Sequence, residues 1–149
     1  MTTPQHTQID AAHAADAAAI FALLEQQHLP LDGLRDHLST TLVARTDGGQ
    51  IVGSAALEIY ADGALLRSVA IAADRQQRGL GRQLTESAIA LARDRQVRAI
   101  YLLTTTAEEY FPRFGFERIA RAEVPPGVQT SVEFTSACPS SATVMRKTL

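Results

Sequence analysis

The chain has 149 residues, of which 46% are hydrophobic and 20% are charged, and its formal net charge at pH 7 is −2. This size and composition are typical of one globular domain, and the lack of a basic cluster argues against a nucleic-acid-binding protein. The single cysteine, Cys138, excludes an internal disulfide and cannot hold a zinc ion alone. We therefore expect a single domain over residues 1–149.

The N-terminal region shows no sign of a signal peptide or a membrane anchor. No basic segment precedes its apolar stretch, and Asp16 and Glu25 interrupt that stretch. The sequence therefore predicts a cytoplasmic protein that binds neither membranes nor nucleic acid.

The first half of the chain predicts two helices followed by three strands. Residues 10–28 are rich in alanine and carry an apolar face, which predicts a helix that Pro30 ends. A second, short helix is predicted over residues 32–39. Turn signals at Asp47-Gly48-Gly49 and Asp62-Gly63 separate apolar segments that predict an antiparallel meander. Its three strands are predicted over residues 41–45, 50–60 and 64–72.

The second half alternates helices and strands, so the whole order predicts an α+β fold. The apolar stretch at 99–106 is rich in β-formers and predicts a buried strand. The other predicted elements are a helix over 80–95, a short helix over 107–114 broken near Pro112 and ended by Gly115, strands over 116–124 and 141–149, and a mostly irregular segment over 125–140.

Gly79 and Gly81 precede the helix-forming run 82–95, although glycine costs about 1 kcal/mol relative to alanine inside a helix. A helix N-terminus exposes unpaired N–H groups and attracts anions. Without Cβ atoms a phosphate can reach that backbone directly, and Arg78 and Arg82 add positive charge. One glycine would suffice for a tight entry into the helix, so two favour a pyrophosphate site.

The segment 76–81, Gln-Gln-Arg-Gly-Leu-Gly, resembles the Q/R-x-x-G-x-G/A signature of the GNAT acyl-CoA N-acyltransferases. It lacks the Lys-Ser/Thr ending of a P-loop and the third glycine of a dinucleotide fingerprint. Residues 107–116 resemble the family's A-x-x-x-Y-x-x-x-G-F segment, with Ala107, Gly115 and Phe116 in register. The segments LLRSVAI, YLLTTTAEEYF, RAEVP and SACPSSA further resemble the bacterial arsenic-resistance N-acetyltransferase subgroup.

The resemblance covers the chain from its first predicted helix to its C-terminus. It implies an α/β/α arrangement with a mixed, largely antiparallel sheet of about six to seven strands, splayed between the fourth and fifth. It also implies acetyl-CoA as cosubstrate, no metal, and a possible homodimer. The residues implied to bind the cofactor are Val69, Ala70, Ile71, Gln76, Gln77, Arg78, Gly79, Leu80, Gly81, Arg82, Thr104 and Phe111.

Hairpin geometry predicts the residues of the acceptor site. If Asp62-Gly63 is the two-residue loop, Glu58 faces Arg67, and directly opposed residues share a face of the sheet. Arg67 would also lie on the side of Val69 and Ile71. Arg67 cannot be a base but can bind a carboxylate bidentately. The resemblance implies acid–base groups on that side near the start of the fourth strand, so Glu58 is predicted as the catalytic base, directly or through a water, unless the two residues only form a stabilising ion pair. The predicted substrate-binding residues are Arg67, Ser68 and Tyr60.

The general acid departs from the family pattern. The family's tyrosine would lie four residues before Gly115, where this chain has Phe111. Tyr110 lies one position earlier, about 100° around a helix. Either Pro112 distorts the helix so that Tyr110 acts as the acid, or no side chain protonates the thiolate. Thr104 replaces the asparagine of many relatives, and its hydroxyl either contacts the cofactor or makes only a local bond.

The histidines and the cysteine form no metal-binding pattern. All four histidines precede residue 40, and surface or capping roles are expected for them. Cys138 is expected to be a small buried hydrophobe, because one thiol does not make a binding site for trivalent arsenic.

The resemblance implies direct transfer of an acetyl group from acetyl-CoA to the primary amine of a small, anionic, amino-acid-like molecule of the arsinothricin or phosphinothricin type, and Arg67 suits such an anionic substrate. Three alternatives stay open. The chain could bind acyl-CoA as a sensor or interaction module without turnover, or acetylate another amine, such as a polyamine or a protein N-terminus. It could also be a domain that does not bind CoA, in which the glycine turn is purely structural.

Overall fold

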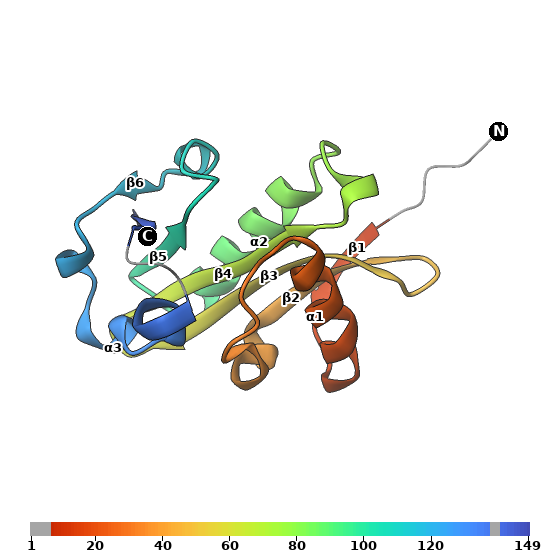
Figure 1. Ribbon diagram of the computed structural model, residues 1–149, viewed down its shortest axis with the longest axis horizontal. Helices are drawn as coiled ribbons and strands as arrows, with labels where there is room; N and C mark the ends of the chain where they lie inside the picture. Colours follow the sequence, from red (N-terminus) through yellow and green to blue (C-terminus); the bar gives the residue numbers. More distant parts are fainter. Residues whose placement is uncertain (1–6, 138–140) are drawn as a thin grey trace.

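The computed structural model describes residues 7–137 and 141–149, so Cys138 lies outside the described residues. These residues form a seven-stranded sheet in the order β1-β2-β3-β4-β5-β7-β6, with helices on both faces (Figure 1). The strands are β1 (Thr7–Ala11), β2 (Thr41–Thr46), β3 (Ile51–Tyr60), β4 (Gly63–Ile71), β5 (Ala99–Thr104), β6 (Glu117–Arg118) and β7 (Thr143–Thr148).

The sheet opens between its fourth and fifth strands. All neighbouring strands pair antiparallel except β4 and β5, which run parallel. Their ladder contains two pairs, Ala64 with Ile100 and Leu65 with Tyr101. Beyond these pairs the two strands diverge (Figure 1). The predicted mixed and splayed sheet is therefore confirmed, and the divergence leaves main-chain groups of β4 without a strand partner on that side.

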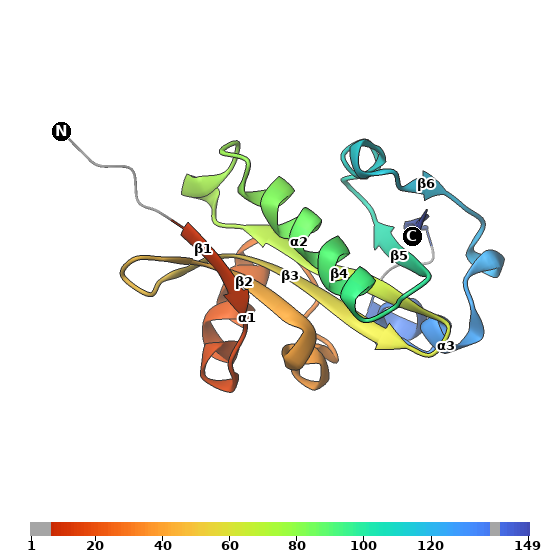
Figure 2. The same ribbon diagram turned by 180° about the vertical axis from the view of Figure 1, so that it is seen from behind.

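Helices α1 (Ala17–Gln26) and α2 (Leu80–Asp94) cover opposite faces of the sheet (Figures 1 and 2). Leu80, Leu84 and Ala88 recur every third or fourth residue and bury one side of α2 in the larger core. Ile20 and Leu24 bury α1 in a second core on the other face. A short helix, α3 (Pro126–Gln129), belongs to a third core beside β5.

None of the described helices has the length and apolar content needed to span a membrane.

Two segments differ from the sequence-based expectations. Residues 7–11 form an edge strand, β1, where a helix was expected to begin at residue 10. This strand is half exposed and rich in polar residues, so no apolar alternation marks it. The strand expected over 116–124 is reduced to β6, because a 3-10 turn follows at Arg121–Glu123, where the Glu123 carboxylate accepts the Ala120 N–H at 2.8 Å.

The β3–β4 hairpin has a different register from the expected one. Tyr60 pairs with Gly63, so the loop is Ala61-Asp62 rather than Asp62-Gly63. The Asp62 carboxylate instead accepts the backbone N–H of Gly127 at 2.8 Å, which fixes the hairpin tip against α3. The register shift is two residues, and a shift of two leaves every side chain on its predicted face.

Candidate active site

The turn between β4 and α2 presents backbone N–H groups. Gln77 and Gly79 both adopt left-handed conformations, with φ of 65° and 79°. Gly79 is the N-cap of α2, and no side chain caps its first turn. The Gln76 amide donates to the carbonyl of Ile71 at 3.1 Å and so ties the turn to the end of β4. The first N–H groups of α2 are therefore available to an anion.

The two glycines of this turn are required for different reasons. Gly79 has open space around its Cα but needs its left-handed φ. At Gly81 space is the constraint, because a Cβ there would lie 3.1 Å from the Tyr110 hydroxyl and 3.7 Å from Cγ1 of Ile71. The Tyr110 hydroxyl therefore lies over the first turn of α2, and the Arg113 guanidinium stacks 4.6 Å from its ring centre.

A groove of about 920 Å³ runs from this turn along the separated strands β4 and β5. The predicted site residues that line it are Arg67, Ser68, Val69, Ala70, Ile71, Gln76, Gln77, Gly79, Gly81, Arg82, Thr104, Tyr110 and Phe111. Four predicted residues do not line it: Glu58, Tyr60, Arg78 and Leu80. Leu80 is buried in the core beneath α2, and Arg78 is exposed to solvent.

Thr104 and Phe111 have local structural roles at the groove wall. The Thr104 hydroxyl accepts the backbone N–H of Ala107 at 2.9 Å, which begins the turn after β5. Phe111 is buried in the core on the α2 face, with its ring edge-on to Tyr110 and Phe116. Both residues shape the groove at the end of β5.

A β-bulge at Ser68 changes the direction of the side chains along β4. Ser68 has φ of 59°, and the register with β3 shifts at this point. After the bulge, Val69 and Ile71 pack against the α2-face core, whereas Ala70 packs against the α1-face core. The expectation that Arg67 shares the side of Val69 and Ile71 is therefore wrong, because the extra residue reverses the alternation.

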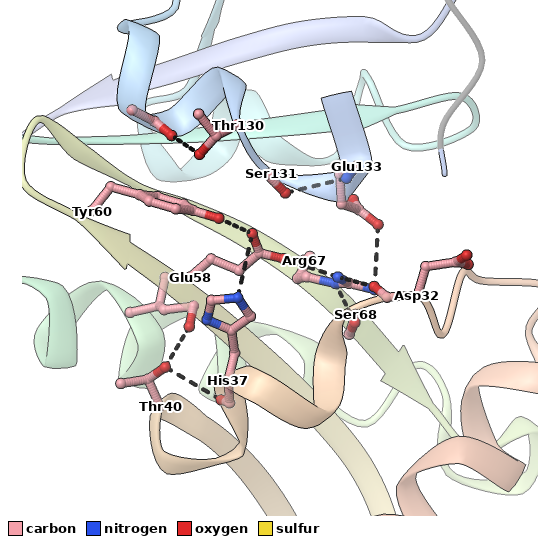
Figure 3. Close-up of polar contacts among 12 residues, drawn as sticks. Asp32, His37, Thr40, Glu58, Tyr60, Arg67, Ser68, Thr130, Ser131 and Glu133 are labelled. Atoms are coloured by element: carbon pink, nitrogen blue, oxygen red, sulfur yellow. Dashed lines mark hydrogen bonds and ion pairs between the residues drawn. The ribbon is translucent and has the colours of Figure 1, made fainter. Parts of the chain in front are cut away.

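Arg67 is the centre of a buried charge cluster on the α1 face (Figure 3). Its side chain is 0% exposed, and its five N–H groups are surrounded by acceptors from four segments of the chain. Nε donates a hydrogen bond to Ser68 Oγ at 3.2 Å. Nη1 donates to Glu58 Oε2 at 2.9 Å and to the Asp32 carbonyl at 2.6 Å. Nη2 donates to the Pro30 carbonyl at 3.0 Å and forms an ion pair with Glu133 Oε2 at 3.5 Å.

Glu58 is almost completely enclosed, with 1% of its side chain exposed. Burial raises its pKa, but hydrogen bonds from Ser131, Tyr60 and Arg67, together with the nearby His37 ring, outweigh burial and hold the pKa below its ordinary value. Burial and the bond to Glu58 in turn raise the pKa of Tyr60 to about 12. Glu58 and Arg67 therefore form the expected ion pair, although they are not directly opposed, since Glu58 pairs with Leu65 in the ladder. Glu58 is a weak proton acceptor in this arrangement.

Sequence reasoning did not find Glu133, which begins a helical turn at Glu133–Ala137. Glu133 is 5% exposed, lines the groove, and lies near Nη2 of Arg67, whereas Glu58 contacts Nη1 (Figure 3). The sequence reasoning also assigned no site role to Ser131 or His37, both of which lie beside Glu58. One sequence signal was present: Glu133 is the only charged residue between Val124 and Ala142.

Comparisons with known proteins agree with this geometry. A family model described as the acetyltransferase (GNAT) domain matches residues 37–118. No curated protein sequence matches the chain.

Among solved structures, N-acetylglutamate synthase from Neisseria gonorrhoeae, complexed with coenzyme A and N-acetyl-glutamate, is 25% identical with a TM-score of 0.82 over 99% of this chain. The chain spans 36% of that protein's length. A Mycobacterium tuberculosis protein in complex with CoA is 24% identical, with a TM-score of 0.81 over 95% of this chain and 99% of its own. This chain belongs to the GNAT acetyltransferase family.

Proposed function

We propose that this protein transfers an acetyl group from acetyl-CoA, by direct attack, to the primary amine of a small amino-acid-like molecule. The observation that carries the proposal is the continuous groove that begins at the open N-terminus of α2 and reaches the Arg67 cluster. One end of it suits an anionic cofactor and the other end holds titratable side chains, as an acyl transfer requires.

The cofactor would lie along the edge of β4. Its pyrophosphate would accept hydrogen bonds from the N–H groups that follow Gly79, with Arg82 nearby. Its pantetheine arm would bond to main-chain groups of residues 69–71, which β5 leaves free by diverging. The bulge at Ser68 interrupts the ladder where the thioester would then lie, beside Arg67.

Tyr110 is reassigned in this proposal from the general acid to the phosphate end of the cofactor. Its hydroxyl lies against Gly81 at the start of α2, at the opposite end of the groove from Arg67. A thiolate with an ordinary pKa of about 8.5 can leave without a dedicated acid and take its proton from the attacking amine. Neither Tyr110 nor Phe111 is then needed for proton transfer.

The proposed acceptor class comes from two observations. One structural neighbour, N-acetylglutamate synthase, is complexed with an acetylated amino acid. The proposed acceptor end of the groove is also lined by the buried charged residues Arg67 and Glu133, which suits a small polar molecule. Within this class we propose arsinothricin-like and phosphinothricin-like amino acids as the first candidates, in keeping with the resemblance to arsenic-resistance enzymes.

A second candidate is a polyamine or another dication. The Arg67 cluster contains two buried carboxylates for one guanidinium, so it favours a positively charged group over a negative one. The ammonium group of an amino acid meets this condition as well, but a polyamine lacks the carboxylate. Acceptors with and without a carboxylate therefore separate the two candidates.

The test is release of the CoA thiol from acetyl-CoA in the presence of phosphinothricin, an arsinic amino acid, L-glutamate or spermidine. We expect turnover with the amino-acid analogues, and its loss in Gly81→Val, where the added side chain obstructs the phosphate end. Turnover with spermidine alone would select the second candidate. CoA binding without any thiol release would overturn the proposed activity and favour a sensor.

A further inference from the structure

Glu133 is the single carboxylate among the described residues that line the groove. We infer that Glu133 receives the ammonium group of the acceptor and removes its proton, so that Glu133, rather than Glu58, is the catalytic base. This inference rests on the proposed acetyl transfer and assigns the acceptor end of the same groove. Arg67 and Glu58 are then positioning residues.

The charge balance of the cluster favours a cation. Two carboxylates, of Glu58 and Glu133, face the single guanidinium of Arg67, and all three side chains are at least 94% buried. The His37 ring lies 3.8 Å from Glu58, is 25% exposed and does not line the groove. An incoming ammonium would pair with Glu133 at the groove, whereas an incoming carboxylate would place a like charge beside Glu133 in a poorly solvated site. Tyr60 stays uncharged at neutral pH because its pKa is about 12, so it does not alter this balance.

The hydrogen bonds of Arg67 also argue against a direct role in binding a substrate carboxylate. Each of its nitrogens already has a protein acceptor, including two main-chain carbonyls, from Pro30 and Asp32, that cannot move independently of the loop after α1. A carboxylate could reach Arg67 only by displacing one of these acceptors. The guanidinium is therefore a fixed support that holds the two carboxylates in place.

The two carboxylates differ in how they can accept a proton. Both oxygens of Glu58 are occupied, Oε1 by the Tyr60 hydroxyl at 2.5 Å and Oε2 by Arg67 at 2.9 Å, and Glu58 does not line the groove. Glu133 lies 3.5 Å from Arg67, beyond ordinary hydrogen-bond length, and lines the groove. Of the two carboxylates, only Glu133 is placed where an acceptor in the groove can reach it.

The reaction balances with these groups alone. The acceptor R–NH3⁺ gives one proton to the Glu133 carboxylate, and the resulting R–NH2 lone pair attacks the thioester carbonyl carbon. The C–N bond forms and the C–S bond breaks, so that the CoA thiolate leaves. The second proton passes from the amide nitrogen to the thiolate, and Glu133 later releases its proton to water. The products are the N-acetyl amide, CoA thiol and one proton.

Binding tests the site without requiring turnover. The CoA-loaded protein is titrated with butylammonium and, separately, with butyrate, and NMR shifts give the two affinities. We expect butylammonium to bind and butyrate not to bind. Preference for butyrate, or no binding of butylammonium, would overturn the inference. This comparison uses the wild-type protein, so it stands even if a Glu133 variant unfolds.

Substitution then identifies the residue. Glu133→Gln should weaken butylammonium at least tenfold, while Glu109→Gln, which changes an exposed glutamate outside the groove, should leave it unchanged. Equal affinity in Glu133→Gln and wild type would overturn the assignment.

Turnover measurements test the role of Glu133 as base separately from the proposed acetyl transfer. With an acceptor that releases CoA thiol, Glu133→Gln should lower kcat by about 10²- to 10⁴-fold and leave CoA affinity unchanged. With an aminooxy analogue as acceptor, whose nitrogen is unprotonated at neutral pH, the same substitution should lower kcat far less. An equal fall in kcat with both acceptors would overturn the role of Glu133 as base. Selective binding of butylammonium without any turnover would instead contradict the proposed function and retain the ammonium site.

Discussion

The two ends of the groove are built in contrasting ways. The glycine turn is one continuous segment, residues 76–81, that presents main-chain N–H groups and open space. The Arg67 cluster is assembled from side chains and carbonyls of strands β3 and β4, the loop after α1, and residues 131–133. The proposed phosphate end therefore depends on local backbone conformation, and the proposed acceptor end depends on tertiary packing.

The largest expected effect comes from removing the centre of the cluster. Arg67→Met leaves Glu58 and Glu133 buried without their shared cation, so we expect the free energy of unfolding to fall by about 3–5 kcal/mol, measured by urea denaturation at pH 7. Arg78→Met, a matched change at an exposed arginine, should cost less than about 0.5 kcal/mol. A loss below about 1 kcal/mol for Arg67→Met would show that the cluster is not a buried unit.

The same variant has a defined pH dependence. The pKa of Glu58 is lowered in the folded protein, so its ionised form contributes stability above the unfolded pKa of about 4.3. That contribution disappears as the pH falls through the folded pKa. The difference in stability between wild type and Arg67→Met should therefore shrink as the pH falls below about 4. A difference that is constant with pH would contradict the electrostatic origin.

The phosphate end should lose binding rather than stability. In Gly81→Val the new side chain occupies space near Tyr110 and Ile71, so CoA affinity by calorimetry should fall at least tenfold, or about 1.4 kcal/mol. Gly81→Ala should show a smaller loss because it adds only the Cβ. Unchanged CoA affinity in Gly81→Val would remove the turn from the cofactor site.

A simpler ion pair, outside the groove, gives a scale for the buried cluster. Arg45 donates two hydrogen bonds of 3.0 Å to Asp16 and, with other contacts, lowers the Asp16 pKa from 3.8 to about 2. Its stabilisation is present above pH 4 and is lost as the pH falls toward 2. Asp16→Asn should therefore lower the free energy of unfolding by about 1–2 kcal/mol at pH 7. It should also reduce the loss of stability between pH 4 and 2. The same loss of stability over this pH range in the variant and in wild type would contradict this.

The smallest expected effect on stability comes from Thr104, which lines the groove at the end of β5. Thr104→Val removes the acceptor of the Ala107 N–H and should lower stability by about 1 kcal/mol. CoA affinity should remain within about twofold of wild type, because the structure gives the hydroxyl a local bond. A tenfold loss of CoA affinity at constant stability would assign the hydroxyl to the cofactor instead.

Much of the fold could be predicted from the sequence because its central elements carry strong apolar patterns. Strands β3, β4 and β5 and helix α2 were expected within a few residues of their observed bounds. Strand β1 was not, since its pairing with β2 fixes a half-exposed polar segment that has no pattern of its own. Pairing with the free edge of β2 therefore decides the structure of this segment, rather than the strand propensity of its own residues.

The candidate site was predictable where it depends on neighbours in the sequence. The glycine turn was identified directly, and the pairing of Glu58 with Arg67 survived an error in register because a shift of two residues keeps the face. The bulge at Ser68 could not be foreseen from an ordinary serine in a strand. Glu133 reaches Arg67 only through the fold, because the two residues are far apart in the chain.

The most direct test of the whole account is a crystal structure of the protein with acetyl-CoA bound. The account predicts the pyrophosphate on the N–H groups at the start of α2, the pantetheine arm along β4, and the acetyl group beside the bulge at Ser68, on the side of the groove that Glu133 lines. A cofactor that avoids the turn, or an acetyl group directed away from Glu133, would contradict it.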